Sequence, residues 1–355
     1  MYLLRFITVF SLATSVSLAA VIDTEGLPDT GLDTSSWTTG EAPPLKDILN
    51  LHDIQLAAKN TLSKTSYGNQ GFPNSYYRSN LMRMFQAFFR TGALDETTYY
   101  SNLNIWKNIK LKSRAFRNVA TVNTETTILG HKFAQPFFIT SAGLAGLSDP
   151  VNGELNFVRS AAKTGILYAS SIASNKTTAE IGAAAANNQT LFRQLYPWSN
   201  VTRLENDIKE IEEAGFKAIL LTVDNPTEEG IRTRSRRADG PDSTNTHAQD
   251  FDLAALLALQ NQTSLPIIPK GISNWQDAAL LHTLGFPAIY ISNHGGRLID
   301  GQQTAVEVLL DLRKNAPEVL DDGKMEIYAD GGVRHGTDVI KLLALGARAV
   351  GLGRS

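Results

Sequence analysis

Polar and ionisable side chains stand at the ends of eight short apolar runs in the second part of this sequence. Among them are Asp224, Lys270, His294, Asp330 and Arg354. A histidine held by a carboxylate can act as a general base, and a lysine or an arginine can bind an anion. Together these residue types indicate acid–base chemistry beside an anionic group.

Three of the candidate residues are open to a closer interpretation. Lys270 ends an apolar run, so it should face an anionic partner: either a carboxylate such as Asp224 or the electron-rich edge of a cofactor ring. His294 and Asp224 could form an oriented imidazole–carboxylate pair. Arg297, three residues after His294, is suited to bind a substrate carboxylate through two hydrogen bonds.

Glycine-rich segments follow the last two apolar runs. DGGVRHG (330–336) and GLGR (351–354) place glycines and an arginine at these points. Glycine lets backbone N–H groups approach a ligand closely, and Arg334 can supply a bidentate cation. Barrels of alternating strands and helices commonly bind a phosphate after their seventh and eighth strands. These two segments therefore predict a phosphate site.

The spacing of the runs predicts a fold that would bring these side chains together. Segments with helical periodicity, such as TRLENDIKEIEEAG and GTDVIKLLALGA, separate the runs. This alternation favours an α/β fold of the (β/α)8 TIM barrel type, in which the strand ends meet at one mouth. A doubly wound open sheet is the alternative, but SAGLAG after the first run matches its glycine fingerprint only weakly. The expected strands lie within residues 136–143, 165–171, 191–196, 216–224, 265–271, 287–296, 325–332 and 348–355.

Residues 1–20 have the pattern of a secretory signal peptide. Arg5 precedes an apolar stretch over Phe6–Leu18, and the small residues Ala19 and Ala20 follow it. The stretch is short and interrupted by hydroxyl residues, which favours a cleaved signal over an N-terminal membrane anchor. We therefore expect a secreted protein that keeps no stable membrane span after cleavage.

The rest of the chain divides into a leader and one large domain. Residues 21–44 are polar and rich in Thr, Gly and Pro, so they suit a flexible leader. Residues 45–117 have helical periodicity and are expected to form a helical cap, and the barrel is expected over residues 136–355. Residues 45–355 would thus form a single catalytic domain.

The composition excludes several classes of protein. The 355 residues contain no Cys, which rules out disulfide frameworks, thiolate catalysis and Cys-ligated metal sites, and we expect no resident metal. Lys and Arg total 33 and Asp and Glu total 35, so a net charge of −2 gives no bulk attraction to nucleic acid. A mean hydropathy of −0.14 excludes a polytopic membrane protein.

The segments SNHGGR and DGGVRHGTDVIKLLALGA resemble the FMN-dependent α-hydroxy-acid oxidase and dehydrogenase family, which includes glycolate oxidase, lactate oxidase and flavocytochrome-type lactate dehydrogenase. The likeness extends from about His52 to the last residue and includes ETTILGHKFAQPF, DPVNGE, RQLYPW, AGFKAILLTVDNP and LPIIPKG. The resemblance implies a (β/α)8 barrel with FMN at its mouth and the oxidation of a small 2-hydroxy acid to a 2-oxo acid. The electron acceptor would be oxygen or an unidentified partner, and a homo-oligomer is compatible with the resemblance.

The resemblance also assigns individual roles. His294 would be the catalytic base, Asp224 would stabilise its protonated form, and Lys270 would lie beside the N1–O2 edge of the flavin. The substrate contacts would be Arg297, Tyr196 and, across a one-residue difference in length, Arg232. The remaining cofactor contacts would be Ser141, Ala142, Ser170, Gln194, Thr222, Ser292, Asp330, Gly332, Arg334, Gly353 and Arg354.

Three features depart from the family pattern. Phe88 stands where the family has a substrate-binding tyrosine, and Ile172 occupies a position that sets side-chain preference, so the preferred 2-hydroxy acid stays open. The chain stops at Ser355, whereas family members continue into a helical segment that covers the eighth strand, so we expect exposed apolar surface on the first and eighth strands. The alternatives are a fragment, a non-catalytic flavin-binding homologue, and a barrel in which Lys270 forms a Schiff base.

Overall fold

Two compact units, Met1–Ser63 and Lys64–Ser355, make up the chain, and each is described by itself. The computed structural model describes residues 29–38, 40–61, 92–225 and 247–354. The predicted signal peptide lies outside these residues, as do Phe88, Arg232 and Ser355.

The described part of the first unit contains a short 3-10 helix, η1 (Leu45–Asp47), and the helix α1 (Leu51–Thr61). Asn50 and Asp53 cap the start of α1 reciprocally. The Asn50 Oδ1 atom accepts a hydrogen bond from the backbone N–H of Asp53, and Asp53 Oδ2 accepts one from the N–H of Asn50.

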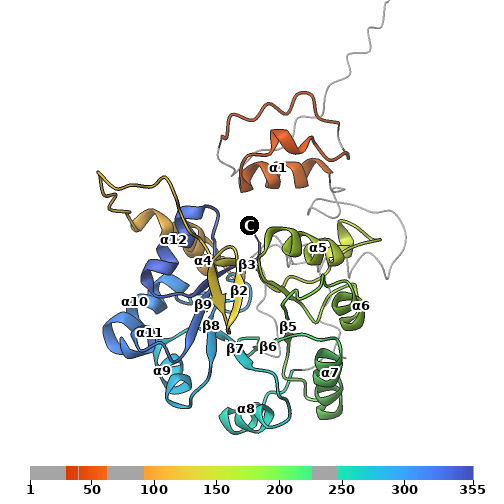
Figure 1. Ribbon diagram of the computed structural model, residues 1–355, viewed down its shortest axis with the longest axis vertical. Helices are drawn as coiled ribbons and strands as arrows, with labels where there is room; N and C mark the ends of the chain where they lie inside the picture. The colour runs from red at the N-terminus through yellow and green to blue at the C-terminus, as the bar shows by residue number, and fades with distance from the viewer. Residues whose placement is uncertain (1–28, 39, 62–91, 226–246, 355) are drawn as a thin grey trace, which may run out of the picture. The chain divides into compact units, whose positions relative to one another are not determined.

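The second unit is built on a closed barrel of eight parallel strands (Figure 1). Each strand pairs with the next one along the chain, and the last pairs with the first, β10 against β3. The strands are β3 (Phe137–Ile139), β4 (Tyr168–Ser170), β5 (Leu191–Leu195), β6 (Ala218–Thr222), β7 (Ile267–Ile272), β8 (Ala288–Ile291), β9 (Glu326–Ala329) and β10 (Ala349–Leu352). Every predicted run coincides with one strand, although β7 ends one residue beyond its run, so the TIM-barrel prediction is confirmed.

Helices alternate with the strands along the chain and surround them in Figure 1. They bury apolar side chains at spacings of three and four residues, as Leu204, Ile208 and Ile211 do in α7. The helices are α5 (Leu155–Thr164), α6 (Thr178–Ala183), α7 (Val201–Glu213), α8 (Leu253–Gln260), α9 (Trp275–Thr283), α10 (Ala305–Asn315), α11 (Glu318–Asp321) and α12 (Gly336–Leu345), and a 3-10 helix, η3 (Ala145–Leu147), follows β3.

Alternate strand residues fill the interior of the barrel. Phe192, Leu220, Ile268 and Tyr290 belong to one buried cluster, whereas their sequence neighbours pack in a second cluster with the helices. The alternation continues to the strand ends. A residue two positions after an interior residue therefore points into the mouth, which is how the barrel directs its polar strand ends to one place.

A hairpin closes the other end of the barrel. Its strands, β1 (Thr126–Ile128) and β2 (His131–Phe133), pair antiparallel, and Ile128 and Phe133 are buried in the interior cluster. The backbone N–H of Leu129 donates to Glu326 Oε2 over 3.0 Å, at the first residue of β9. The hairpin therefore caps the end opposite to the carboxyl ends of the strands.

The predicted helical cap is shorter than its sequence pattern. Its described part in the second unit is α4 (Thr97–Asn104) followed by the 3-10 helix η2 (Ile105–Asn108), and residues 109–117 contain no helix, although the pattern predicted one. Phe116 is fully exposed and Leu111 is half exposed in this segment. A short helix gains most of its stability from a packed apolar face, and these side chains have none.

Burial differs between the first and the last barrel strand. Three of the four residues of β10 are buried, whereas Phe137 and Ile139 of β3 are half-buried. Phe137 lines a groove with Val339 and Leu343 of α12. The expected exposed apolar surface is therefore reduced to partial burial: Phe137 and Ile139 of β3 and Leu352 of β10 are half-buried, and none of them is exposed.

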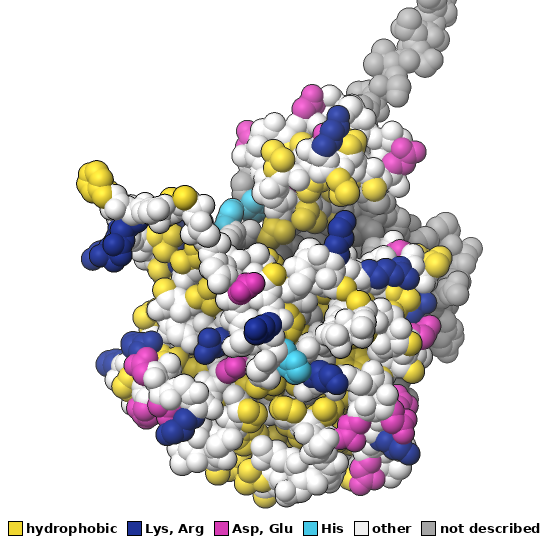
Figure 2. Space-filling model, in the orientation of Figure 1, with side chains coloured by type: hydrophobic (Ala, Val, Ile, Leu, Met, Phe, Trp, Pro, Cys, Tyr) yellow, Lys and Arg dark blue, Asp and Glu magenta, His cyan; other side chains and the backbone are white. Residues whose placement is uncertain are grey.

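The surface of the described residues carries mixed charge. Figure 2 shows basic and acidic side chains interspersed over the described part of the face in view. Within the described residues, no helix combines the length and the apolar character that crossing a membrane requires.

Candidate functional site

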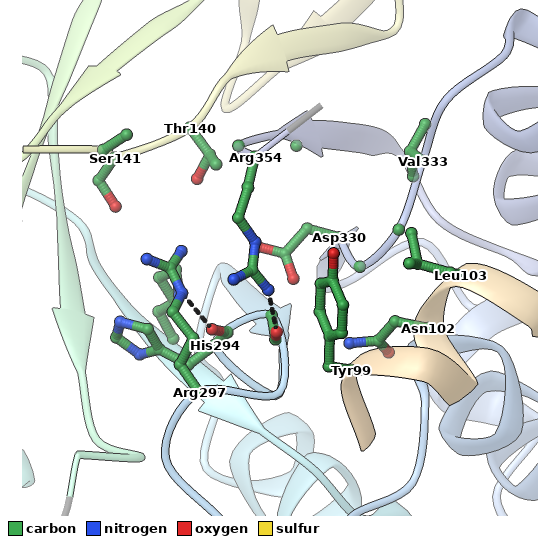
Figure 3. Close-up of a pocket in the computed structure, with 17 residues that line it drawn as sticks. Tyr99, Asn102, Leu103, Thr140, Ser141, His294, Arg297, Asp330, Val333 and Arg354 are labelled. Carbon is green, nitrogen blue, oxygen red and sulfur yellow. Dashed lines mark hydrogen bonds between the residues drawn. The ribbon is translucent and has the colours of Figure 1, made fainter. Parts of the chain in front are cut away.

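A pocket opens at the carboxyl ends of the strands, between the barrel mouth and α4 (Figure 3). Side chains from the ends of β3, β7, β8, β9 and β10 meet there, together with side chains of α4. The predicted site residues that line the pocket are Ser141, Ala142, Lys270, His294, Arg297, Asp330, Gly332, Gly353 and Arg354.

His294 and Asp224 form the predicted imidazole–carboxylate pair. Their Nδ1 and Oδ1 atoms are 3.1 Å apart, and both side chains are almost fully buried. The backbone of His294 is left-handed, with a φ of 56°, and its N–H donates to Ser292 Oγ over 3.1 Å. A non-glycine residue in this conformation is strained, and such strain is concentrated at functional sites.

The surroundings set the protonation of this pair. Burial lowers the pKa of His294 below its usual value, and the charges of Lys270 and Arg297 add to that effect, although Asp224 opposes it. Burial by itself would raise the pKa of Asp224, but the charge and hydrogen bond of His294 and the charge of Lys270 keep it lowered. At neutral pH the pair is therefore a neutral imidazole beside a carboxylate, which is the state that a general base requires.

Lys270 lines the pocket and is buried. Its Nζ atom donates to Ser292 Oγ over 3.3 Å and lies 5.2 Å from the centre of the Tyr290 ring. The ion pairs among the described residues do not include one between Lys270 and Asp224, so the simple salt-bridge interpretation is not realised. The ammonium group is instead positioned to meet an anionic ligand.

The ends of β5 and β6 are joined below the pocket. Gln194 Nε2 donates to Thr222 Oγ1 over 3.0 Å, and Gln194 Oε1 accepts from the hydroxyl of Ser171 over 3.1 Å. All three side chains are buried. A ligand at the mouth would therefore meet a fixed set of amide and hydroxyl groups.

Ser170 is placed differently from its prediction as a flavin contact. Its Oγ accepts a hydrogen bond of 3.0 Å from Nη1 of Arg193, its neighbour on β5. Side chains alternate along β4, so Ser170 points to the same face as Tyr168, which packs outside the barrel. Ala169, between them, faces the interior. The hydroxyl that faces the interior at this position belongs to Ser171, which the sequence analysis did not select.

The predicted substrate contacts are only partly brought together. Arg297 lines the pocket and donates from Nε to the carbonyl oxygen of His294 over 3.0 Å (Figure 3). Tyr196 is half-buried and is not one of the residues that line the pocket. The centroid of its ring lies 5.5 Å from that of Trp198 and 4.4 Å from that of His247. Arg232 lies outside the described residues.

The other end of the pocket is formed by the two glycine-rich segments. Gly332 has a φ of 67°, and a Cβ atom there would overlap the carbonyl oxygen of Asn102. A Cβ at Gly353 would lie 3.2 Å from Thr140 Cγ2. Arg334 begins the approach to α12, where its N–H donates to Asp338 over 3.1 Å. Only glycine fits the first of these positions, because the backbone of α4 lies against it, and Gly332 also lines the pocket.

The residues present fit FMN. Oδ1 of Asp330 is buried and has no hydrogen-bond partner, which a ribityl hydroxyl would satisfy. The glycine-lined end with Arg354 suits a phosphate, and Lys270 suits the electron-rich edge of a flavin ring. In the described part of the chain, no group of three His, Asp or Glu side chains is arranged to hold a metal ion.

Helix α4 contributes side chains to the pocket that no motif in the sequence indicated. Tyr99 and Asn102 line the pocket, and the Asn102 and Asn293 side chains exchange two hydrogen bonds of 2.8 and 2.9 Å. A spacing of three residues places Tyr99 and Asn102 on one face of a helix, which was the available signal. That signal gave no reason to direct this face to the barrel mouth.

The chain is similar in sequence to a family of flavin-dependent enzymes and to several known members of it. A family model described as FMN-dependent dehydrogenase matches residues 77–247 and 232–355. L-lactate dehydrogenase (cytochrome) of Saccharomyces cerevisiae is 31% identical over 337 residues, which cover 88% of this chain and 54% of that protein. Human 2-hydroxyacid oxidase 2 is 33% identical over 79% of this chain and 83% of its own length.

Among solved structures, a flavocytochrome b2 variant with sulfite bound matches with a TM-score of 0.77 and 31% identity, over 88% of this chain and 76% of that one. The chain thus spans about half the length of the yeast lactate dehydrogenase that it matches.

Proposed function

This chain belongs to the FMN-dependent dehydrogenase family, and on that basis we propose that it oxidises a small 2-hydroxy acid to the 2-oxo acid with FMN as cofactor. The observation that supports the proposal most directly is the His294–Asp224 pair at 3.1 Å, in a pocket that also contains Lys270 and Arg297. A base and two cations within one buried site match the needs of an anionic substrate that must lose a proton.

Each of these residues has a defined task in the proposed reaction. Arg297 binds the carboxylate of the acid and fixes its orientation. Asp224 holds Nδ1 of His294, so the ring would accept the substrate's proton at Nε2, and the same carboxylate stabilises the imidazolium that forms. FMN, when bound, supplies the acceptor for two electrons.

Lys270 and the strand ends prepare the site for a change of charge. The buried ammonium of Lys270 lies where it would favour negative charge on a ligand, and Ser292 keeps it in position. Next to it, the hydrogen bond between Gln194 and Thr222 holds their amide and hydroxyl groups in one orientation. These groups are held by one another before any ligand arrives, so the site needs little reorganisation.

The test uses the full chain and its own absorption spectrum. Purified protein should bind one FMN, and anaerobic mixing with L-lactate, glycolate or mandelate should bleach the oxidised flavin absorbance. A folded protein that binds no flavin contradicts the proposal. Flavin that binds but is not bleached by any 2-hydroxy acid identifies the non-catalytic homologue instead.

The electron acceptor, the assembly and the location are further parts of this proposal. We propose oxygen or a partner protein as acceptor, and the rate of flavin reoxidation in air distinguishes the two. We also propose a homo-oligomer, whose mass light scattering measures.

The pattern of residues 1–20 supports entry into the secretory pathway. N-terminal sequencing of protein recovered from the medium tests that step, and an intact Met1 there would contradict it.

A further inference from the structure

Tyr99 lines the pocket from α4 and has no role in the proposed reaction so far. Figure 3 shows its side chain directed into the pocket, with the hydroxyl end toward Asp330 in this view. A tyrosine hydroxyl is a hydrogen-bond donor that stays neutral at physiological pH. Such a donor next to Arg354, which lines the same pocket, is suited to an anion.

The backbone of Tyr99 is held in place by the loop that carries the base. The N–H of Thr98 donates to Asp300 over 2.8 Å, and a Cβ atom at Gly296 would lie only 2.6 Å from the Tyr99 nitrogen. The start of α4 therefore packs directly on the loop after His294. A ring attached there has little freedom to leave the pocket.

The same helix is fixed one turn later. Asn102 and Asn293 exchange two hydrogen bonds, and both side chains are almost fully buried. Asn102 is three residues from Tyr99 and lies on the same helix face. Because both turns of α4 are tied to the loop after β8, the direction of the Tyr99 hydroxyl is set before a ligand binds.

The charge at this end of the pocket comes from Arg354. Its guanidinium carbon lies 4.6 Å from the centre of the Tyr99 ring, and it donates a hydrogen bond to the carbonyl oxygen of Gly295 (Figure 3). Stacking on an aromatic face holds a guanidinium in one plane while its edge still donates hydrogen bonds. The ring and the cation thus form one unit that faces the pocket.

We propose that Tyr99 is an anion-binding residue, whose hydroxyl donates to an oxygen of the anion that pairs with Arg354. The anion is a phosphate monoester or a carboxylate, since both offer an oxygen to a neutral donor and an arginine together. In this chain its source is either the phosphate of FMN or the carboxylate of the 2-hydroxy acid. The inference rests on the proposed function, because that function supplies both anions.

The experiment compares Tyr99→Phe with Tyr100→Phe in the full chain. The first variant loses only the hydroxyl and keeps the ring that stacks on Arg354. Tyr100 is the matched control, because it is 47% exposed, lies outside the set of lining residues and touches the Tyr99 ring edge-on at 5.1 Å. Flavin fluorescence measures the dissociation constants of FMN and riboflavin from the apoprotein, and steady-state kinetics with L-lactate give kcat and KM.

Two results support the proposal and identify the source of the anion. If Tyr99 binds the cofactor's phosphate, Tyr99→Phe weakens FMN roughly three- to tenfold, which corresponds to one hydrogen bond, and leaves riboflavin unchanged. If it binds the substrate, FMN affinity is unchanged and KM rises by the same factor while kcat is retained. Tyr100→Phe changes neither constant in either case.

Other results overturn it. Equal weakening of FMN and riboflavin assigns Tyr99 a packing role, and wild-type values in every assay leave its hydroxyl without a function in binding. An effect of Tyr100→Phe as large as that of Tyr99→Phe also contradicts the proposal. A wild-type protein that binds no flavin and oxidises no 2-hydroxy acid refutes the proposed function itself, and the anion-binding role is refuted with it.

Discussion

The two ends of the pocket are built from different parts of the chain. At the end of the base, His294, Asp224, Lys270 and Ser292 are joined by side-chain hydrogen bonds and contacts of 3.1 to 3.3 Å. At the glycine-rich end, the wall consists of backbone at Gly332, where a Cβ would not fit. Hydrogen-bonded side chains therefore organise the first end. The second end depends on a glycine, which has no side chain and so allows close backbone packing.

The two ends should respond differently to substitution. Truncating a side chain at the first end removes a chemical group but leaves room for the ligand, so it should affect turnover more than binding. Adding a Cβ at the second end leaves every reacting group in place but forces the backbone of α4 away from the glycine-rich segment, so it should affect binding and stability. Variants at the two ends separate these effects.

The largest effect is expected at the base. His294→Gln removes the proton acceptor, and because a general base contributes typically 10² to 10⁴-fold, the rate of flavin reduction should fall by about that factor. FMN content should stay near that of the wild type, since the fold is kept. Stopped-flow absorbance measures both.

The control is another His–Asp pair of the described chain, formed by His282 and Asp322. His282 Nε2 of α9 and Asp322 Oδ2, directly after α11, are 3.0 Å apart and neither residue lines the pocket, so His282→Gln should keep the wild-type rate. A His294→Gln variant within tenfold of the wild type would remove this histidine from the reaction.

A smaller effect, on binding, is expected at the glycine-rich end. Gly332→Ala places a Cβ against the carbonyl oxygen of Asn102 at a φ of 67°, so it should reduce FMN affinity by about tenfold or more and the free energy of unfolding by about 2 kcal/mol. Gly336→Ala is the control, because nothing lies within 4 Å of a Cβ there. Equal affinities of both variants, measured by fluorescence titration, would show that the close contact of Gly332 with α4 does not shape the ligand site.

The smallest expected effect is a change in pH dependence at the base. His294 accepts a proton only when neutral, so kcat/KM should fall as the pH drops through its lowered pKa, which places the acid limb below pH 6.5. Asp224 raises the pKa of His294 against the effects of burial and the cations. Asp224→Asn should therefore move the acid limb to lower pH while reducing kcat. A limb that moves to higher pH would contradict this account of the pair.

Much of this site could be read from residue types at strand ends. Lys270, His294 and Asp330 follow runs of apolar residues, and the barrel topology requires such ends to meet at one mouth. Side-chain alternation explains why Gln194 and Thr222 point inward together. The positions of these residues were predictable because strand spacing and strand alternation are local properties of the sequence.

Other features depended on partners that are distant in sequence. Ser170 and Ser171 are adjacent hydroxyls, and only the pairing of β4 with β5 sends the first to Arg193 and the second to Gln194. Leu111 and Phe116 are exposed and pack on nothing, so residues 109–117 form no helix although their pattern predicts one. The direction of Tyr99 depended on how α4 packs on the loop after His294.

The sequence by itself determined the alternation of eight strands with helices and the glycine-rich ends of the last two strands. It also determined the residue types of the base, the carboxylate and the cations. Short-range periodicity encodes all of these, because strand and helix repeats are visible within a few residues. The tertiary structure alone decided which hydroxyl faces the interior, how Lys270 is partnered and which side of α4 forms a wall of the pocket. Those outcomes depend on contacts between segments up to about 200 residues apart, such as that of Thr98 with Asp300, and no local pattern specifies them.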